Sequence, residues 1–240
     1  MTAWWVRGDT VMAELGKLEK PEAEQFQGKR KLYLVPLLYT WSDSPLEYTI
    51  KYDLYWDQVR EHVANLEGKL GKVKRIYHES VTAPGEDGLR ILERLNSASH
   101  QLIKDECSAG AELELVEDKD LVEESMDWER HLIIGFLSEK VARTVSQFFA
   151  DASHRRYEHI AKRISETLKD GEAGMLVVRE GHGIQFPKDI EVFMVAPPAL
   201  DEVHRWLRER QAKAEAEEEA SEKEAAQPQP EPETKPPSAQ

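Results

Sequence analysis

Short apolar runs alternate with helix-like segments over most of the chain, and this alternation limits the fold more than any other feature. The strand-like runs lie at residues 31–38, 73–77, 175–179 and 190–195. The longest segments with apolar residues at three- and four-residue spacing, typical of helices, lie at 46–70 and 120–168. Strand–helix alternation of this kind predicts an α/β protein with a mostly parallel sheet flanked by helices.

Finer patterns give the remaining elements. A fifth strand is predicted at 111–117, and shorter helices at 88–96, 100–107 and 201–210. Pro36 suggests an edge position or a bulge for the first strand, because proline cannot donate a ladder hydrogen bond. Nearly fifty helical residues exceed a typical globular helix, so a break is expected near 151–153. The run at 175–179 is apolar throughout, which is typical of a strand covered on both faces.

Composition divides the chain into an arm (1–28), a single α/β domain (29–210) and a tail (211–240). The tail has eight Glu, three Lys and five of the twelve Pro, and it lacks Val, Ile, Leu and aromatic residues. Such a segment buries too little apolar surface to offset the entropy of ordering, so disorder is predicted. Residues 212–226 could instead prolong the preceding helix, and a docking role toward a protein partner is the functional alternative.

Charge and cysteine content restrict partners and compartment. The chain carries −14, of which the tail contributes −5, so the body is acidic and nucleic acid is not expected as a partner. No apolar run approaches the length of a membrane span. A single cysteine, Cys107, excludes an internal disulfide and fits a reducing compartment. Because the first residues also lack a signal-peptide pattern, a soluble cytoplasmic protein is predicted.

Two histidines follow predicted strands. His182 lies between Gly181 and Gly183, which permit a positive φ angle and close approach of a ligand. His78 and Glu79 follow the strand at 73–77. Because open α/β sheets bind ligands at the carboxyl ends of their strands, we expect both histidines to meet at one edge. They would serve acid–base chemistry or hold a divalent metal; the alternatives are a turn histidine and exposed strand-end groups.

The helix before the last two strands carries further candidates. Arg156 could clamp an anionic group or form a surface salt bridge. Glu158 lies four residues after His154, so that pair could hold a metal or form a solvated ion pair. Glutamates at 112, 114 and 117 alternate along the fifth strand, with Glu117 on the opposite face from the other two, and a functional carboxylate among them is a further candidate.

Three short motifs resemble a known superfamily. They are Ile76-Tyr77-His78-Glu79, the helix segment Arg156-Tyr157-Glu158-His159-Ile160-Ala161, and the strand end Arg179-Glu180-Gly181-His182. Their order is similar to that in the superfamily of TraB/PrgY proteins, TIKI proteins, ChaN haem-binding lipoproteins and erythromycin esterases. The resemblance covers roughly residues 70–195, and it implies a shared α/β fold with functional groups at the strand ends.

The leading hypothesis from these patterns is a hydrolase of ester, lactone or peptide bonds, with a small-molecule or peptide substrate. His182 or Glu79 would act as general base, His78 as a second proton-transfer or metal group, and Arg156 would stabilise negative charge. Glu158 completes the predicted pocket. A non-catalytic ligand-binding or regulatory protein is the alternative. The cofactor is left open, with a divalent metal held by His78 and His182 as one choice.

Overall fold

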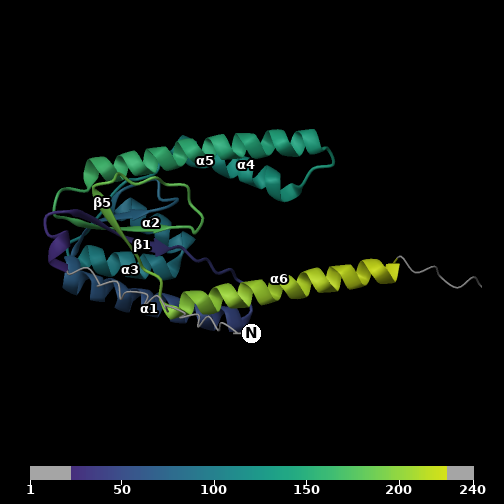
Figure 1. Ribbon diagram of the computed structural model, residues 1–240, viewed down its shortest axis with the longest axis horizontal. Coiled ribbons are helices and arrows are strands. Elements are labelled where there is room, and N and C mark those ends of the chain that lie inside the picture. The colour runs from purple at the N-terminus through teal and green to yellow at the C-terminus, as the bar shows by residue number, and fades with distance from the viewer. Residues whose placement is uncertain (1–22, 226–240) are drawn as a thin grey trace, which may run out of the picture.

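A computed structural model describes residues 23–225 and has a five-stranded, all-parallel sheet between two helical layers (Figure 1). The strands are β1 Arg30–Pro36, β2 Val73–His78, β3 Glu112–Leu113, β4 Ala173–Val178 and β5 Ile190–Met194, in the order β3-β2-β4-β1-β5. The predicted α/β class with a parallel sheet is confirmed. β4 lies at the centre and is buried along its whole length, as its unbroken apolar sequence predicts.

One face of the sheet is covered by helices from three parts of the chain. These are α1 Leu46–Leu70, α2 Gly85–Leu95 and α3 Ser97–Ser108, together with the start of α6 Pro198–Ala225. Helix α1 has the predicted bounds. Its buried residues include Tyr48, Tyr52, Tyr55, Val59 and Val63, whose spacing of three or four places them on one side of the helix. This face contains the larger hydrophobic core.

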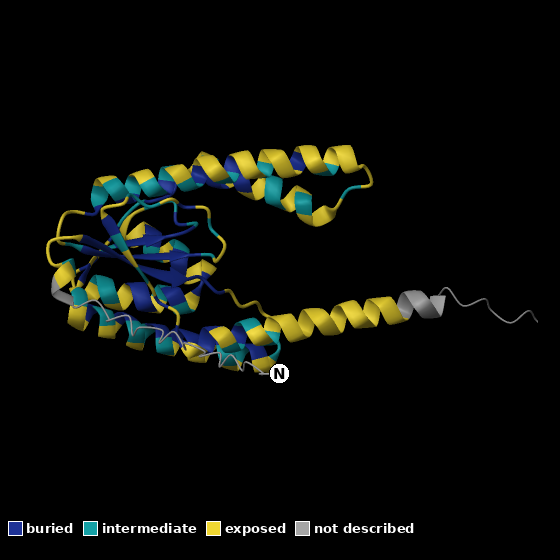
Figure 2. Cartoon of the chain, viewed as in Figure 1, coloured by how far each residue is buried: buried dark blue, intermediate teal, exposed yellow. Residues whose placement is uncertain are grey.

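The opposite face is covered by α5 Glu139–Thr167, which follows α4 Lys119–Ile134. Ile160 and Ile164 of α5 pack with Leu176 and Val178 of β4 to form the second core. The two cores explain why buried residues, dark blue in Figure 2, lie on both sides of the strands. A buried side chain at the end of a central strand therefore meets either the α1/α3 layer or the α5 layer.

Some sequence predictions of the elements were wrong. The long helix breaks at Gly135–Ser138, not near 151–153, because Gly135 adopts a φ angle of 78° that ends α4. β1 is an interior strand between β4 and β5, so Pro36 does not mark an edge; it is the last residue of the strand. The predicted strand at 111–117 is reduced to Glu112–Leu113, since only Arg75 and Ile76 pair with it.

The C-terminal helix is longer than the predicted 201–210. Helix α6 continues to Ala225, through much of the segment for which disorder was predicted and helix prolongation was the alternative. Residues 226–240 lie outside the described part, as do residues 1–22 of the predicted arm. In the described part no helix is long and apolar enough to cross a membrane.

Candidate functional site

Two carboxylates and two guanidinium groups form a buried network at the carboxyl edge of the sheet. Glu79, directly after β2, is fully buried. Its Oε2 accepts a hydrogen bond of 2.6 Å from the Arg179 backbone N–H, and its Oε1 accepts one from Arg179 Nε. Arg156 Nη2 lies 3.4 Å from the same Oε1. Glu79 thus joins the end of β2 to the end of β4 and to helix α5.

The second carboxylate, Glu117, follows β3 and faces Arg156. Arg156 Nε lies 3.1 and 3.0 Å from the two Glu117 oxygens, and Nη2 also donates to Oε1. The Ser80 N–H donates to that oxygen at 2.9 Å. Burial disfavours the charged guanidinium, but the Glu117 hydrogen bond and both carboxylates more than offset this and raise the pKa of Arg156. Arg156 is therefore charged near neutral pH.

Arg179 extends this network toward the surface. Its Nη1 donates to Glu129 of α4 at 3.0 Å, and about a third of its side chain is exposed. Burial opposes the charge of Arg179, yet Glu79 and Glu129 raise its pKa. The guanidinium is therefore held from two sides while one edge reaches the adjoining cavity.

That cavity has a volume of about 220 Å³ and lies at the carboxyl ends of β1, β4 and β5. Its walls are mostly apolar, with three polar side chains. The apolar walls come from Leu34, Pro36, Val178, Met194, Ala196 and Leu200, and the polar groups from Arg179, Glu180 and His182. Glu180 Oε2 is 2.6 Å from His204 Nε2 of α6, so α6 closes one side of the cavity.

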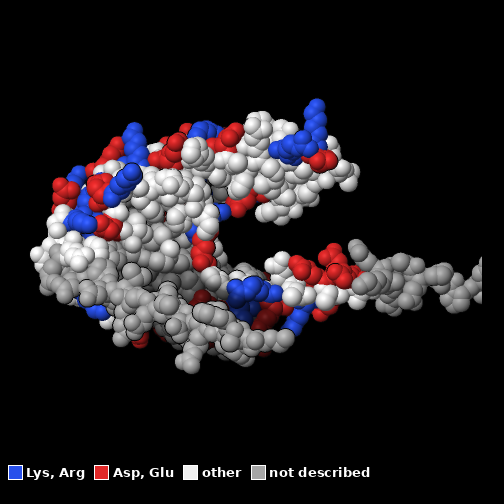
Figure 3. Space-filling model, in the orientation of Figure 1, with Lys and Arg blue, Asp and Glu red and all other residues white. Residues whose placement is uncertain are grey.

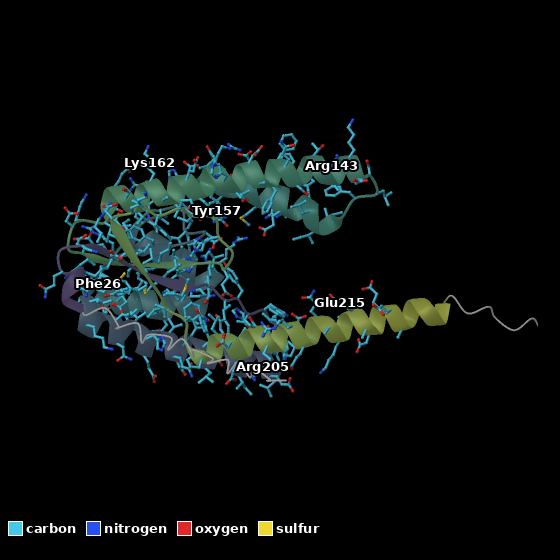
Figure 4. All side chains as sticks on the ribbon, in the orientation of Figure 1. Phe26, Arg143, Tyr157, Lys162, Arg205 and Glu215 are labelled. Atoms are coloured by element: carbon cyan, nitrogen blue, oxygen red, sulfur yellow. The ribbon has the colours of Figure 1, made fainter. Side chains whose placement is uncertain are left out.

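His182 is half-buried in the loop after β4. Gly181 has a φ angle of 73°, the left-handed region that favours glycine, and a Cβ at Gly183 would lie 3.2 Å from the Tyr157 ring, a tight contact. The imidazole packs edge-on against Tyr157, with ring centroids 6.5 Å apart. Tyr157 points from α5 toward the body of the protein, whereas Lys162 points into solvent (Figure 4).

The hydrogen bonding of His182 fixes what it can offer a ligand. Its Nδ1 accepts from the Ile184 N–H at 3.3 Å. The neutral imidazole therefore carries its proton on Nε2, which is a donor. Burial lowers the pKa of His182, so the neutral form predominates near neutral pH, although nearby Glu79 acts in the opposite direction.

His78 lies on the other face of the sheet. Its Nδ1 donates to the Glu79 carbonyl oxygen, and its Nε2 is 3.2 Å from Ser99 Oγ of α3. Because a carbonyl can only accept, Nδ1 carries the proton, and the unprotonated Nε2 lies beside the Ser99 hydroxyl, which is also within hydrogen-bond distance of the Asn96 carbonyl oxygen. Burial lowers the pKa of His78 to about 4. His78 is thus a neutral, hydrogen-bonded group between β2 and α3.

The two imidazoles therefore do not meet as the sequence led us to expect. His78 contacts the α3 layer, and His182 contacts Tyr157 of α5, on the opposite face. Among residues 23–225, no group of three or more His, Cys, Asp or Glu side chains could hold a metal ion. His78 and His182 thus do not come together as ligands of one divalent metal ion.

Glu158 also lies apart from the site. It is exposed on α5, with an oxygen 3.3 Å from His154 Nε2, so it forms the solvated pair that was one of the two sequence interpretations. Of the five predicted site residues, the structure joins only Glu79 and Arg156 by a hydrogen bond between side chains, and places His182 at the adjoining cavity. His78 and Glu158 face elsewhere.

Sequence reasoning missed the partners that complete the network. Arg179 was interpreted only as the end of a strand, and Glu129 was not singled out. A signal for Arg179 was available, because a charged residue directly after a fully buried strand must find a partner at the sheet edge. Glu117 was considered as a candidate, but nothing in the sequence linked it to Arg156, 39 residues away.

Comparisons with known proteins add no relative. No protein-family model, curated protein or solved structure matches this chain. The resemblance to the TraB and erythromycin esterase superfamily therefore stays a prediction, and the function must be argued from the site itself.

Proposed function

We propose that this protein binds a small, mostly apolar molecule carrying a hydrogen-bond acceptor in the cavity at the carboxyl edge. The observation that carries the proposal is the placement of His182, a neutral donor through Nε2, in the wall of an otherwise largely apolar cavity of about 220 Å³. Apolar walls with a few placed polar groups are the usual composition of small-molecule sites.

Charge narrows the class of ligand. The three carboxylates of Glu79, Glu117 and Glu129 outnumber the two guanidinium groups of Arg156 and Arg179 that they bind. No excess positive charge is left to attract an anion. A neutral ligand with a carbonyl or similar acceptor fits this balance better than a phosphate or a carboxylate.

Methionine methyl signals test the binding directly. Met194 lines the cavity, whereas Met126 lies on α4. In protein labelled with ¹³C at the methionine methyl groups, the neutral ketone 4-phenyl-2-butanone should shift the Met194 signal and leave Met126 unchanged. Replacing His182 by Ala removes one hydrogen bond, and affinity should fall about tenfold. Replacing the exposed His131 by Ala is the matched control.

Two results would refute this proposal. One is a Met194 signal that does not respond to the ketone. The other is an affinity that is the same in the His182→Ala and His131→Ala variants.

Hydrolysis of an ester, lactone or peptide bond is a second candidate. It is favoured by one observation: burial lowers the pKa of His182, so the imidazole is neutral and able to take up a proton near neutral pH. For this, the ring must release Nδ1 from Ile184 or exchange its tautomer. Release of nitrophenol from 4-nitrophenyl butyrate tests the idea. Turnover should be lost in His182→Ala and kept in His131→Ala; no turnover by the unaltered protein would refute it.

A further inference from the structure

Helix α4 and the first part of α5 form an arm that projects beyond the sheet (Figure 1). The two helices pack against each other through Trp128, whose ring stacks on Phe148 at 5.0 Å, and through the buried Val145. Arg155 of α5 and Glu124 of α4 add an ion pair of 2.6 Å. A two-helix unit of this kind can bury only the side chains between its helices, so any further apolar face stays exposed.

The end of the arm carries such a face, which we call the arm tip: Ile133, Ile134, Leu137 and Val141. The exposed fractions are 80% for Ile133, 82% for Ile134 and 47% for Val141, and Leu137 is completely exposed. Together these side chains expose on the order of 500 Å² of apolar surface, as much as the largest patch of a typical monomer. The structure offers no intramolecular partner for the tip within residues 23–225.

The charge around the tip indicates which partner fits. Residues 127–148 contain three acidic and three basic side chains, so the end of the arm is neutral although the chain carries −14. Arg130 pairs with Asp127 and Arg143 with Glu139, each at 2.8 Å. Figure 3 shows basic and acidic groups side by side at the end of the arm, next to uncharged surface. An anionic membrane would require excess basic charge, whereas two neutral tips do not repel each other.

We propose that the arm tips of two copies of this chain pack together, so that the two helical hairpins complete a four-helix bundle. A four-helix bundle is the common arrangement in which helical hairpins bury their second apolar face. The contact would be isologous, with the same patch on both partners, and so would close as a dimer. Two tips bury about 1,000 Å² in total before their surroundings are counted, which reaches the lower limit for a specific interface.

Sedimentation velocity of the full chain tests the proposal. At concentrations up to about 100 µM, the unaltered protein should show a dimer mass near twice 27.5 kDa. The variant with Ile134→Glu and Leu137→Glu should raise the dissociation constant at least about 100-fold, because each dimer would bury four unpaired charges. The control Ile50→Glu, an exposed apolar residue of α1, should leave the dimer unchanged.

The outcomes separate this proposal from its alternatives. Circular dichroism melting should show that the tip variant is folded, since the replaced side chains are exposed. A monomer at all concentrations, or a dimer that the tip variant forms equally well, overturns the proposal. Co-flotation of a monomer with phosphatidylcholine vesicles, abolished in the tip variant, would assign the tip to a membrane surface instead and also overturns it.

Discussion

His78 gives the sharpest test of whether a predicted catalytic group is structural. Burial lowers its pKa from 6.5 to about 4. The unfolded chain takes up a proton near pH 6.5, whereas the folded chain does so only near pH 4. His78 therefore contributes stability that is fully present above about pH 6.5 and is lost as the pH falls toward 4. From about pH 7.5 to about pH 5 this loss is roughly 2 kcal/mol.

Replacing His78 by Asn removes the titration but keeps a hydrogen-bond donor. The Asn amide N–H can replace Nδ1–H toward the Glu79 carbonyl, while the bond to Ser99 is lost. At neutral pH the variant should be less stable by about 1–2 kcal/mol. When the pH falls from about 7.5 to about 5, however, the free energy of unfolding of the variant should decrease by roughly 2 kcal/mol less than that of the unaltered protein.

Urea unfolding followed by tryptophan fluorescence measures both quantities. The matched control is the same substitution, His131→Asn, at an exposed histidine of α4. An identical pH dependence in the His78→Asn and unaltered proteins would refute the assignment of His78 as a buried neutral group. Binding at the cavity should not change in this variant, because His78 faces the α3 layer.

Four further substitutions test the network and the packing by urea unfolding. Arg156→Met leaves the Glu117 carboxylate buried without its ion-pair partner and should lower the free energy of unfolding by about 3–5 kcal/mol. Adding Glu117→Gln should recover part of this stability. An Arg156→Met variant as stable as the unaltered protein would contradict the buried ion pair. In Gly88→Ala the new Cβ would lie 2.4 Å from the Ala83 carbonyl oxygen, costing about 1–3 kcal/mol. Gly68→Ala, in open space on α1, should instead stabilise by about 0.5–1 kcal/mol, and equal effects at the two glycines would argue against this packing.

Patterns of burial allowed much of the fold to be predicted. Helix α1 has the predicted bounds because aromatic residues repeat along one side and Gly71 follows its last residue. The break between α4 and α5 was misplaced because apolar residues continue through Gly135, so the periodicity gives no sign of a turn. Those apolar residues are exposed at the arm tip, so the core of the chain does not bury them.

The order of strands could not be predicted, because parallel pairing joins segments far apart in the sequence. β4 inserts between β1 and β2, and its position decides which strand ends are neighbours. The pairing of Arg156 with Glu117 depends on this order, since it requires α5 to cross the face of the sheet next to the short β3. Local patterns carry no information about such a contact, so only the presence of unpaired charges at strand ends was predictable.

The separation of His78 from His182 has a physical cause that the sequence already contained. Successive residues of a strand point to opposite faces, so a histidine and a glutamate that follow each other at a strand end cannot both reach one pocket. Tyr77 packs in the α5 core and Ile76 in the α1/α3 core; this alternation places His78 against α3 and Glu79 against α5. A position at the end of a strand thus identifies the edge of the sheet at which a side chain lies. The alternation of side chains along the strand identifies the face of the sheet to which it points. Of His78 and Glu79, only Glu79 points to the face of the sheet on which Arg156 lies.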